Sequence, residues 1–174
     1  LGFGTPAGDD TNACEAAGGK LVAALDGAGA IHAILQLDSP KGKKAEGGFE
    51  DKIARLAAGM ALRHYKFDKY KTEKKNEESE KQTLTSVHIT VDAATAIKKL
   101  FSAYAAAVVG THFARDLMNE PPNMLYPESF AQRVKKELTP LGVEVEILDE
   151  KKLEKLGCGA ALAVGQGSIR PPRI

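Results

Sequence analysis

Residues 92–123 read DAATAIKKLFSAYAAAVVGTHFARDLMNEPPN, and this stretch organises the rest of the chain. Apolar side chains recur along it at spacings of three and four residues, the pattern of a broad buried helix face. We expect a helix from Ala93 to Met118, roughly 40 Å long at 1.5 Å per residue, which is long enough to connect two lobes. Asp92 is expected to cap its start and Pro121-Pro122 to end it. We expect two neighbouring rows of side chains along this helix to be buried. One row is Ile97, Phe101, Ala105, Val109 and Phe113, and the other is Leu100, Tyr104 and Val108.

The residues before this helix alternate between helical and strand patterns. Apolar side chains lie on one helical face in residues 9–25 and again in residues 49–65, although Gly18 and Gly19 weaken the first helix. Residues 30–37 are a short apolar run typical of a buried strand. Residues 83–91 alternate apolar and polar side chains and are rich in β-branched residues, as in a half-exposed strand. The pattern predicts an amino-terminal α/β lobe with a mixed sheet.

The residues after the helix predict a second α/β segment. A helix is expected over 127–138, because proline at its start suits the first turn. A strand is expected over 143–148, followed by a short helix that Asp149 caps and Gly157 ends. A second strand is expected over 160–164, leading into Gly165-Gln166-Gly167.

The segment from Lys66 to Lys81 has a composition unlike the rest of the chain. It contains six lysines and five acidic residues and almost no aliphatic side chain. Such a segment buries too little apolar surface to order itself fully, so we expect a solvated loop. Limited trypsin proteolysis is therefore expected to cut there before it cuts at Lys135 or Lys151.

The overall composition is that of an ordinary globular protein. Lys and Arg total 24 against 23 Asp and Glu, a net charge of +1, which argues against nucleic acid or a membrane surface as a partner. The longest apolar stretch, from Phe101 to Val109, is far shorter than the roughly 20 residues that cross a bilayer. Two cysteines are too few for a disulfide framework. We therefore expect a soluble, cytoplasmic protein.

Both ends of the chain predict a longer polypeptide. Leu1 is not an initiator methionine, and the residues from Leu1 to Gly4 read as the tail of a strand. Ile174 follows Arg-Pro-Pro-Arg as though another strand were beginning. We expect the chain to be a piece truncated at both ends.

Histidine and cysteine show no metal-binding pattern. The four histidines have no short spacing of the kind that places two ligands on one helix or strand, and the two cysteines lie far apart. The sequence therefore favours packed or surface histidines, and inert core thiols on apolar faces. The residues are His32, His64, His88 and His112, and Cys14 and Cys158.

Three further features have both a functional and a simpler interpretation. The glycines Gly2, Gly4 and Gly8 resemble a dinucleotide-binding loop, but their spacing and the intervening proline favour a plain turn. The glycines around Gln166 could surround an anion, although glycine pairs after strands are usually turns. Asp116 and Glu120 lie four residues apart near the end of the long helix, where ion pairing is favoured over catalysis.

Several long motifs resemble one known family. Residues 114–131 read ARDLMNEPPNMLYPESFA and are similar to the interdomain segment of the leucine aminopeptidase (cytosol aminopeptidase) family. Upstream, residues 65–72 (YKFDKYKT) resemble the amino-terminal lobe of this family. The resemblance is weak before Gly48 and strong after Ala114. Its later parts are GVEV at 142–145, LEKLG at 153–157, LAVGQGS at 162–168 and PPR at 171–173.

The resemblance implies a domain organisation and an activity. Residues 1–92 would be part of an amino-terminal α/β lobe, 93–120 the connecting helix, and 121–174 the start of a catalytic domain. The family is one of hexameric metallo-exopeptidases that remove amino-terminal residues, leucine among them, from peptides. Two divalent ions, zinc or manganese, would bind to a lysine motif and an acidic motif that are expected after Ile174. We therefore expect no catalytic, cofactor-binding or metal-binding residue within the chain, which would be scaffold and hexamer-forming surface.

One residue departs from the family, and two other functions stay open. Many relatives have Thr where Tyr126 precedes Pro127, so the usual side-chain cap is missing, at a cost of about 1 kcal/mol.

The alternatives to a portion of an aminopeptidase are a DNA-binding or regulatory module, which the balanced charge disfavours, and a small-molecule-binding α/β domain that uses the loop from Gly2 to Gly8.

Overall fold

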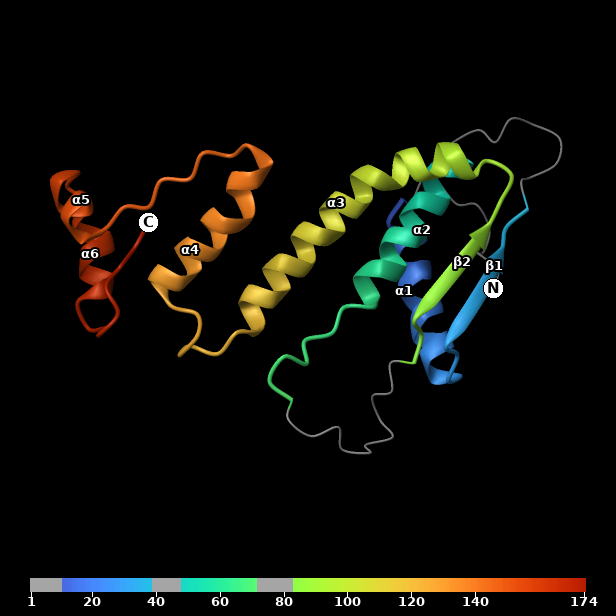
Figure 1. The fold of residues 1–174 in the computed structure, drawn as a ribbon, viewed down its shortest axis with the longest axis horizontal. Helices are drawn as coiled ribbons and strands as arrows, with labels where there is room; N and C mark the ends of the chain where they lie inside the picture. Colours follow the sequence, from blue (N-terminus) through green and yellow to red (C-terminus); the bar gives the residue numbers. More distant parts are fainter. Residues whose placement is uncertain (1–10, 39–47, 72–82) are drawn as a thin grey trace. The chain divides into compact units, whose positions relative to one another are not determined.

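The chain forms two compact units, Leu1–Ala114 and Arg115–Ile174 (Figure 1). The structure is a computed structural model, and it describes residues 11–38, 48–71 and 83–174. Helices and strands alternate in the first unit, which confirms the expected α/β class. The division after Ala114 falls inside a helix, and the domain boundaries at 92 and 120 stay a prediction.

The elements predicted within the described residues of the first unit are present, while the strand tail expected from Leu1 to Gly4 lies outside them. The helices and strands at 9–25, 30–37, 49–65 and 83–91 are confirmed with small shifts of their ends. Part of the predicted loop from Lys66 to Lys81, residues 72–81, lies outside the described residues, and residues 66–71 contain no helix or strand. The elements are α1 (Thr11–Gly27), β1 (His32–Gln36), α2 (Phe49–Arg63), β2 (Ser86–Thr90) and α3 (Ala94–Asn119).

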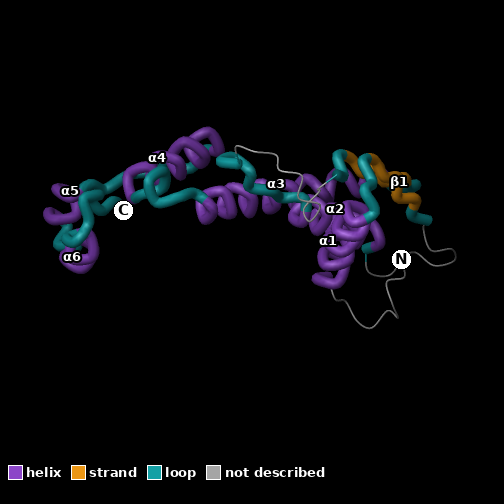
Figure 2. Tube along the Cα trace, turned by 90° about the horizontal axis from the view of Figure 1, so that it is seen from below, coloured by secondary structure: helices purple, strands orange, loops and turns teal. Residues whose placement is uncertain are grey.

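The two strands form a parallel sheet that is covered on one face. His32 lies opposite Ser86, and Gln36 lies opposite Thr90. Alternate residues of β1 are exposed, so one face of the sheet is exposed to solvent and the other packs inward. Figures 1 and 2 show α1 and α2 on the same side of the strands. Two clusters form the core on that side: Val22, Leu56, Met60 and Leu84, and separately Ile53, Ala54 and Ile97.

Helices α1 and α2 pack with their backbones in contact. A Cβ atom added to Gly18 would lie 2.1 Å from the carbonyl oxygen of Leu56, and one added to Gly59 would lie 2.0 Å from that of Glu15. A real Cβ does not fit at either distance, so glycine permits this approach. The glycine at position 18 weakens the helix by itself, yet it lets the two helices close together.

Helix α3 confirms the long helix, but only part of its predicted face is buried. Ile97 and Val108 are buried, whereas Val109 is 68% exposed and Leu100 is 40% exposed. The helix has 26 residues, and α2, against which its first half packs, has 15. A longer helix extends beyond its partner, which leaves Val109 outside the contact. Ala93, not Asp92, directly precedes the first helical residue.

The second unit contains short helices and no assigned strand. Helix α4 (Pro127–Leu138) has the predicted bounds, and α5 (Glu150–Lys155) is capped by Asp149 as predicted. Between them, Thr139–Leu141 forms a short 3-10 helix, η2. The strand expected over 160–164 is wrong, because this alanine-rich segment forms helix α6 (Gly159–Gly165).

The strand expected over 143–148 is not formed as a ladder. Among these residues, Leu148 exchanges two backbone hydrogen bonds with Ile174, at N···O distances of 2.6 and 3.2 Å. One residue pair is too short to count as a strand. No helix in the described part of the chain is both long enough and apolar enough to span a membrane.

Candidate functional site

Two of the four histidines share the exposed face of the sheet: His32 lies opposite Ser86 on β2, and His88 lies opposite Ile34 on β1. The Nδ1 atom of His32, on β1, lies 2.8 Å from Oγ of Ser86 on the neighbouring strand. His88 is on the exposed face of β2, and His64 ends α2. His112 lies on α3 beside the ring of Tyr65, with 5.2 Å between ring centroids.

The cysteines and glycines that the structure describes show no reactive or phosphate-binding arrangement. Cys14 and Cys158 are free and partly exposed, not core residues as expected. The loop from Gly2 to Gly8 lies outside the described residues. Gly165 ends helix α6, so the predicted glycine pair follows a helix and not a strand. A Cβ on Gly165 would lie 2.7 Å from Cδ of Pro172, so this glycine permits a close chain contact.

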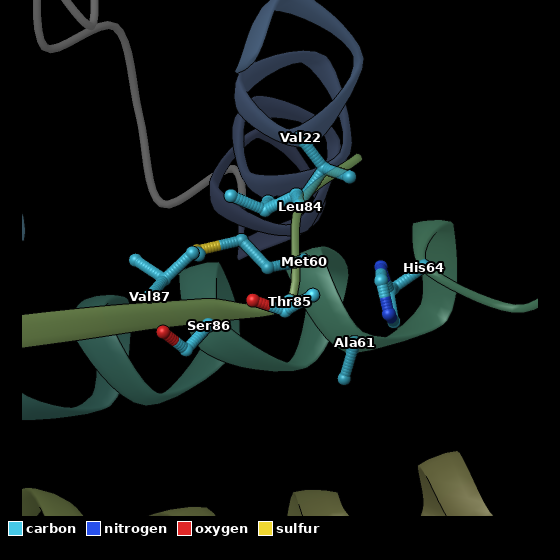
Figure 3. A pocket seen from close by; sticks show the side chains of 8 residues that line it. All are labelled: Val22, Met60, Ala61, His64, Leu84, Thr85, Ser86 and Val87. Atoms are coloured by element: carbon cyan, nitrogen blue, oxygen red, sulfur yellow. The ribbon is translucent and has the colours of Figure 1, made fainter. Parts of the chain in front are cut away.

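A small hollow lies between α1, α2 and the start of β2 (Figure 3). Its volume is about 180 Å³, below the range of roughly 300 Å³ and more that is usual for small-molecule sites. The lining is apolar, and the hydroxyls of Thr85 and Ser86 already have partners, the carbonyl oxygen of Ile31 and the Nδ1 atom of His32 respectively. The hollow is therefore an opening above the first core cluster. It is lined by Val22, Met60, Ala61, His64, Leu84, Thr85, Ser86 and Val87.

A polar cluster joins the three helices of the first unit. The hydroxyl of Tyr104 donates to one carboxylate oxygen of Asp51 at 2.5 Å, and Nε of Arg55 donates to the other at 2.8 Å. The Arg55 guanidinium also lies 4.9 Å from the centre of the Tyr104 ring and 3.4 Å from Glu15 on α1. The bond from Tyr104, and next the bond from Arg55, lower the pKa of Asp51. The same bond to Asp51 raises the pKa of Tyr104.

Glu120 is held by an ion pair within the second unit. Its Oε1 atom accepts from Nη1 of Arg133 on α4 at 2.7 Å, and the Glu120 side chain is only 2% exposed. For this carboxylate the sequence favoured ion pairing with another segment over catalysis. The structure shows such a pair. Burial of the pair makes each partner necessary to the other.

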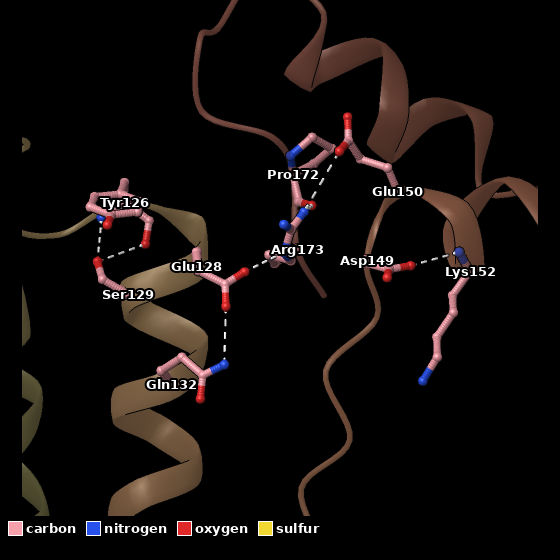
Figure 4. Close-up of polar contacts among 9 residues, drawn as sticks. All are labelled: Tyr126, Glu128, Ser129, Gln132, Asp149, Glu150, Lys152, Pro172 and Arg173. Carbon is pink, nitrogen blue, oxygen red and sulfur yellow. Dashed lines mark hydrogen bonds and ion pairs between the residues drawn. The ribbon is translucent and has the colours of Figure 1, made fainter.

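A second cluster lies around Arg173, near the last residues of the chain (Figure 4). Nε of Arg173 donates to Oε2 of Glu128 at 2.5 Å, and Nη1 donates to the carbonyl oxygen of Pro172 at 2.8 Å. Glu150 lies 3.9 Å from the same Nη1. Gln132 donates to the other oxygen of Glu128, and the bonds from Gln132 and then Arg173 lower the pKa of Glu128. We call Glu128, Gln132, Glu150 and Arg173 the Arg173 cluster.

At the start of α4, no side-chain cap bond is formed by the cap residue, and Ser129 instead binds the N–H of that residue. Tyr126 occupies the cap position in an extended conformation. Oγ of Ser129 accepts from the backbone N–H of Tyr126 at 2.9 Å (Figure 4). The same Oγ donates to the carbonyl oxygen of Met124 at 2.8 Å. The guanidinium of Arg170 lies 4.0 Å from the centre of the Tyr126 ring. The departure from the family pattern is thus accommodated by Ser129 and Arg170.

Reasoning from the sequence missed the Arg173 cluster. Glu128 and Arg173 are 45 residues apart, and no periodicity connects them. The stronger signal was PPR at 171–173, which the sequence offered only as part of the resemblance. The acidic residues in the first turns of α4 and α5 were a second, weaker hint.

The described residues do not fit the two metal ions that the resemblance implies. Within residues 11–38, 48–71 and 83–174, no three His, Cys, Asp or Glu side chains lie close enough together to hold a metal ion. The carboxylates of the two polar clusters are already paired with arginine. We therefore derive no reaction step through a metal on these residues.

The sequence matches the two domains of one family. Residues 1–74 match the N-terminal domain of the cytosol aminopeptidase family, and residues 112–174 match its catalytic domain. A probable cytosol aminopeptidase of Bradyrhizobium sp. (strain BTAi1) is 45% identical over 156 residues, which are 90% of this chain and 30% of that protein. One from Rhizobium etli (strain CFN 42) is 52% identical over 121 residues, which are 70% of this chain and 24% of that protein.

Solved structures show the same relationship. A mutant of tomato leucine aminopeptidase is similar, with a TM-score of 0.78 and 25% identity, over 99% of this chain and 34% of that one. The bottromycin maturation enzyme BotP in complex with Mn has a TM-score of 0.72 and 27% identity, over 97% of this chain and 33% of that one. The chain thus spans about a quarter to a third of the length of these relatives. With both domain matches in their family order, the chain belongs to the cytosol aminopeptidase family.

Proposed function

We propose that this chain is the scaffold portion of a metal-dependent leucyl aminopeptidase, which hydrolyses amino-terminal residues from peptides. The observation that carries the proposal is the match of residues 1–74 to the N-terminal domain and of residues 112–174 to the catalytic domain. The part matched to the catalytic domain has short helices tied together by buried or partly buried ion pairs. Ion pairs of this kind hold backbone segments in position, and the charged groups that form them are not free to react.

The metal ions of the proposed enzyme would bind outside these residues. We propose two divalent ions, manganese or zinc, held by residues of the complete polypeptide and not by this portion. The similarity to BotP, whose structure is a complex with Mn, supports a divalent metal for the whole protein. A cytoplasmic homohexamer is part of the same proposal, and the resemblance to the family supports it.

Two polypeptides decide the proposal: the 174-residue chain and a full-length protein that contains it. Each is incubated with manganese or zinc, dialysed, analysed for bound metal, and assayed with a leucyl anilide. We expect metal and activity in the full-length protein and neither in the 174-residue chain. The controls are the full-length protein treated with a chelator, which should be inactive, and the same protein with metal restored, which should recover.

Two results would contradict the proposal in different ways. Activity of the 174-residue chain would place the active site among residues 1–174. An inactive full-length protein with metal bound would remove the aminopeptidase function. A native mass measurement on the full-length protein tests the hexamer separately.

A further inference from the structure

We propose that Arg173 is a positioning residue for the aminopeptidase reaction, because its ion pair with Glu128 sets the register in which Ile174 pairs with Leu148. This inference rests on the proposed function. It concerns residues of the second unit alone, and their geometry carries it. Arg173 itself would not contact substrate.

Arg173 is less exposed than the other charged groups around it. Its side chain is 17% exposed, against 39% for Glu128 and 57% for Glu150. One guanidinium nitrogen, Nε, donates to Glu128, and another, Nη1, donates to the Pro172 carbonyl and faces Glu150. The guanidinium therefore connects the first turns of α4 and α5 to the backbone carbonyl of Pro172, two residues before Ile174 (Figure 4).

The pairing next to Arg173 has a defined direction. The N–H of Leu148 donates to the carbonyl of Ile174, and the N–H of Ile174 donates to the carbonyl of Leu148. Two residues that exchange both bonds in this way form an antiparallel pair. In such a pair, a slip of one residue turns every following side chain to the opposite face. In the longer polypeptide of the proposed function, the residues that continue from Ile174 inherit this register.

Two neighbouring contacts hold the segment before Arg173 but do not reach the paired residues themselves. Gly165 lets Pro172 approach so closely that a Cβ there would overlap the proline ring. Arg170 lies over the ring of Tyr126, at the start of α4. Arg173 is the residue of this segment whose bonds reach two other helices, so a change there should shift the register while the other two contacts remain.

The substitution Arg173→Lys tests the proposal in the full-length protein. Lysine keeps the positive charge but lacks the planar set of donors that reaches Glu128 and the Pro172 carbonyl together. We expect kcat for a leucyl anilide to fall about 10- to 100-fold with little change in KM, because misplacement by about 1 Å has effects of this size. Glu128→Gln should give a similar loss, and the double variant should lose little more, since both changes remove one interaction.

Two controls separate positioning from general loss of stability. Lys136→Arg exchanges one cation for the other at an exposed residue of α4 in the same unit and should leave kcat unchanged. Leu153→Val changes a fully buried side chain of the same unit and shows what lost stability alone does to kcat at 25 °C. Hydrogen–deuterium exchange, read by mass spectrometry on peptides containing Leu148 and Ile174, should become faster in Arg173→Lys and not in Lys136→Arg.

Each outcome decides between positioning and its alternatives. The proposal would be overturned if Arg173→Lys kept the wild-type kcat. It would also be overturned if its loss of kcat were no larger than that of Leu153→Val when the two variants have equal thermal midpoints. Unchanged exchange at Leu148 and Ile174 would overturn the assigned register. An inactive wild-type protein would remove the proposed function and with it the role of Arg173 in catalysis, while exchange would still show whether Arg173 holds the pairing.

Discussion

Gly59 and Glu15 bring α2 and α1 into backbone contact, because a Cβ on Gly59 would lie 2.0 Å from the Glu15 carbonyl oxygen. Gly18 makes the reciprocal approach from α1 to Leu56 on α2. The first core cluster, which contains Val22 and Met60, is built next to this contact. The spacing of these two helices therefore depends on two residues that have no side chain.

Gly18→Ala is expected to destabilise the first unit. The added methyl group meets backbone atoms, which cannot turn away as a side chain can, so the helices must separate. We expect the free energy of unfolding to fall by about 3 kcal/mol, the upper part of the range for overpacking. Urea denaturation followed by circular dichroism measures the change.

The matched control is the adjacent glycine of the same helix. A Cβ on Gly19 would lie 3.8 Å from its nearest neighbour, which is ordinary contact. Gly19→Ala should therefore raise stability, by up to about 1 kcal/mol, through helix propensity alone. Equal effects of the two substitutions would show that the close contact of α1 and α2 is absent.

Arg133→Met should expose the cost of leaving Glu120 unpaired. The Glu120 side chain is 2% exposed, and its bond to Arg133 is 2.7 Å long. Removing one partner of a buried pair costs several kcal/mol, and the partial exposure of Arg133 reduces this to about 2 kcal/mol. Lys152→Met, which removes an exposed pair with Glu146, should change stability by no measurable amount. Equal unfolding midpoints for the two variants would contradict the prediction.

Tyr104→Phe should change how the free energy of unfolding depends on pH. The bond from Tyr104 is the largest cause of the lowered pKa of Asp51, whose ordinary value is 3.8. A carboxyl group with a lowered pKa stabilises the folded state above its unfolded pKa, and this contribution disappears as pH falls through the folded pKa. The stability difference between wild type and Tyr104→Phe should therefore be largest near neutral pH and shrink below about pH 4.

Two measurements check this prediction. Urea denaturation at several pH values gives the stability difference directly. Titration of the Asp51 carboxyl by NMR should show a midpoint below 3.8 in the wild type and a higher midpoint in the variant. An unchanged midpoint would mean that Arg55 alone controls the charge of Asp51.

Ser129→Ala tests the replacement cap of α4. Oγ of Ser129 bonds the N–H of Tyr126 and the carbonyl of Met124, and alanine loses both bonds. We expect a loss of about 1 kcal/mol, as for other caps. Ser102→Ala is the control, because this hydroxyl bonds a carbonyl within its own helix at an exposed position and contributes little. Thermal unfolding compares the two, and equal midpoints would argue against the cap.

Local pattern in the sequence predicted most helices and both paired strands. Residues 127–138 form the predicted helix because proline at the first turn and evenly spaced apolar residues suit that conformation wherever the segment lies. Asp149 caps α5 by a bond to the N–H of Lys152, only three residues away. Features of this kind depend on neighbours within a few residues, which the sequence displays directly.

Tertiary structure decided what the local pattern left open. Residues 160–164 form a helix and residues 143–148 form no ladder, because a strand exists only when another segment lies beside it to accept its hydrogen bonds. Val109 is exposed although its spacing indicated burial, since α3 is longer than the helix it packs against. By itself the sequence determined the α/β class, the long helix and the family, because these follow from local spacing and motifs. The pairing of Glu128 with Arg173 and the contact of Gly59 with Glu15 depend on distances between segments far apart in the chain, which only the folded structure defines.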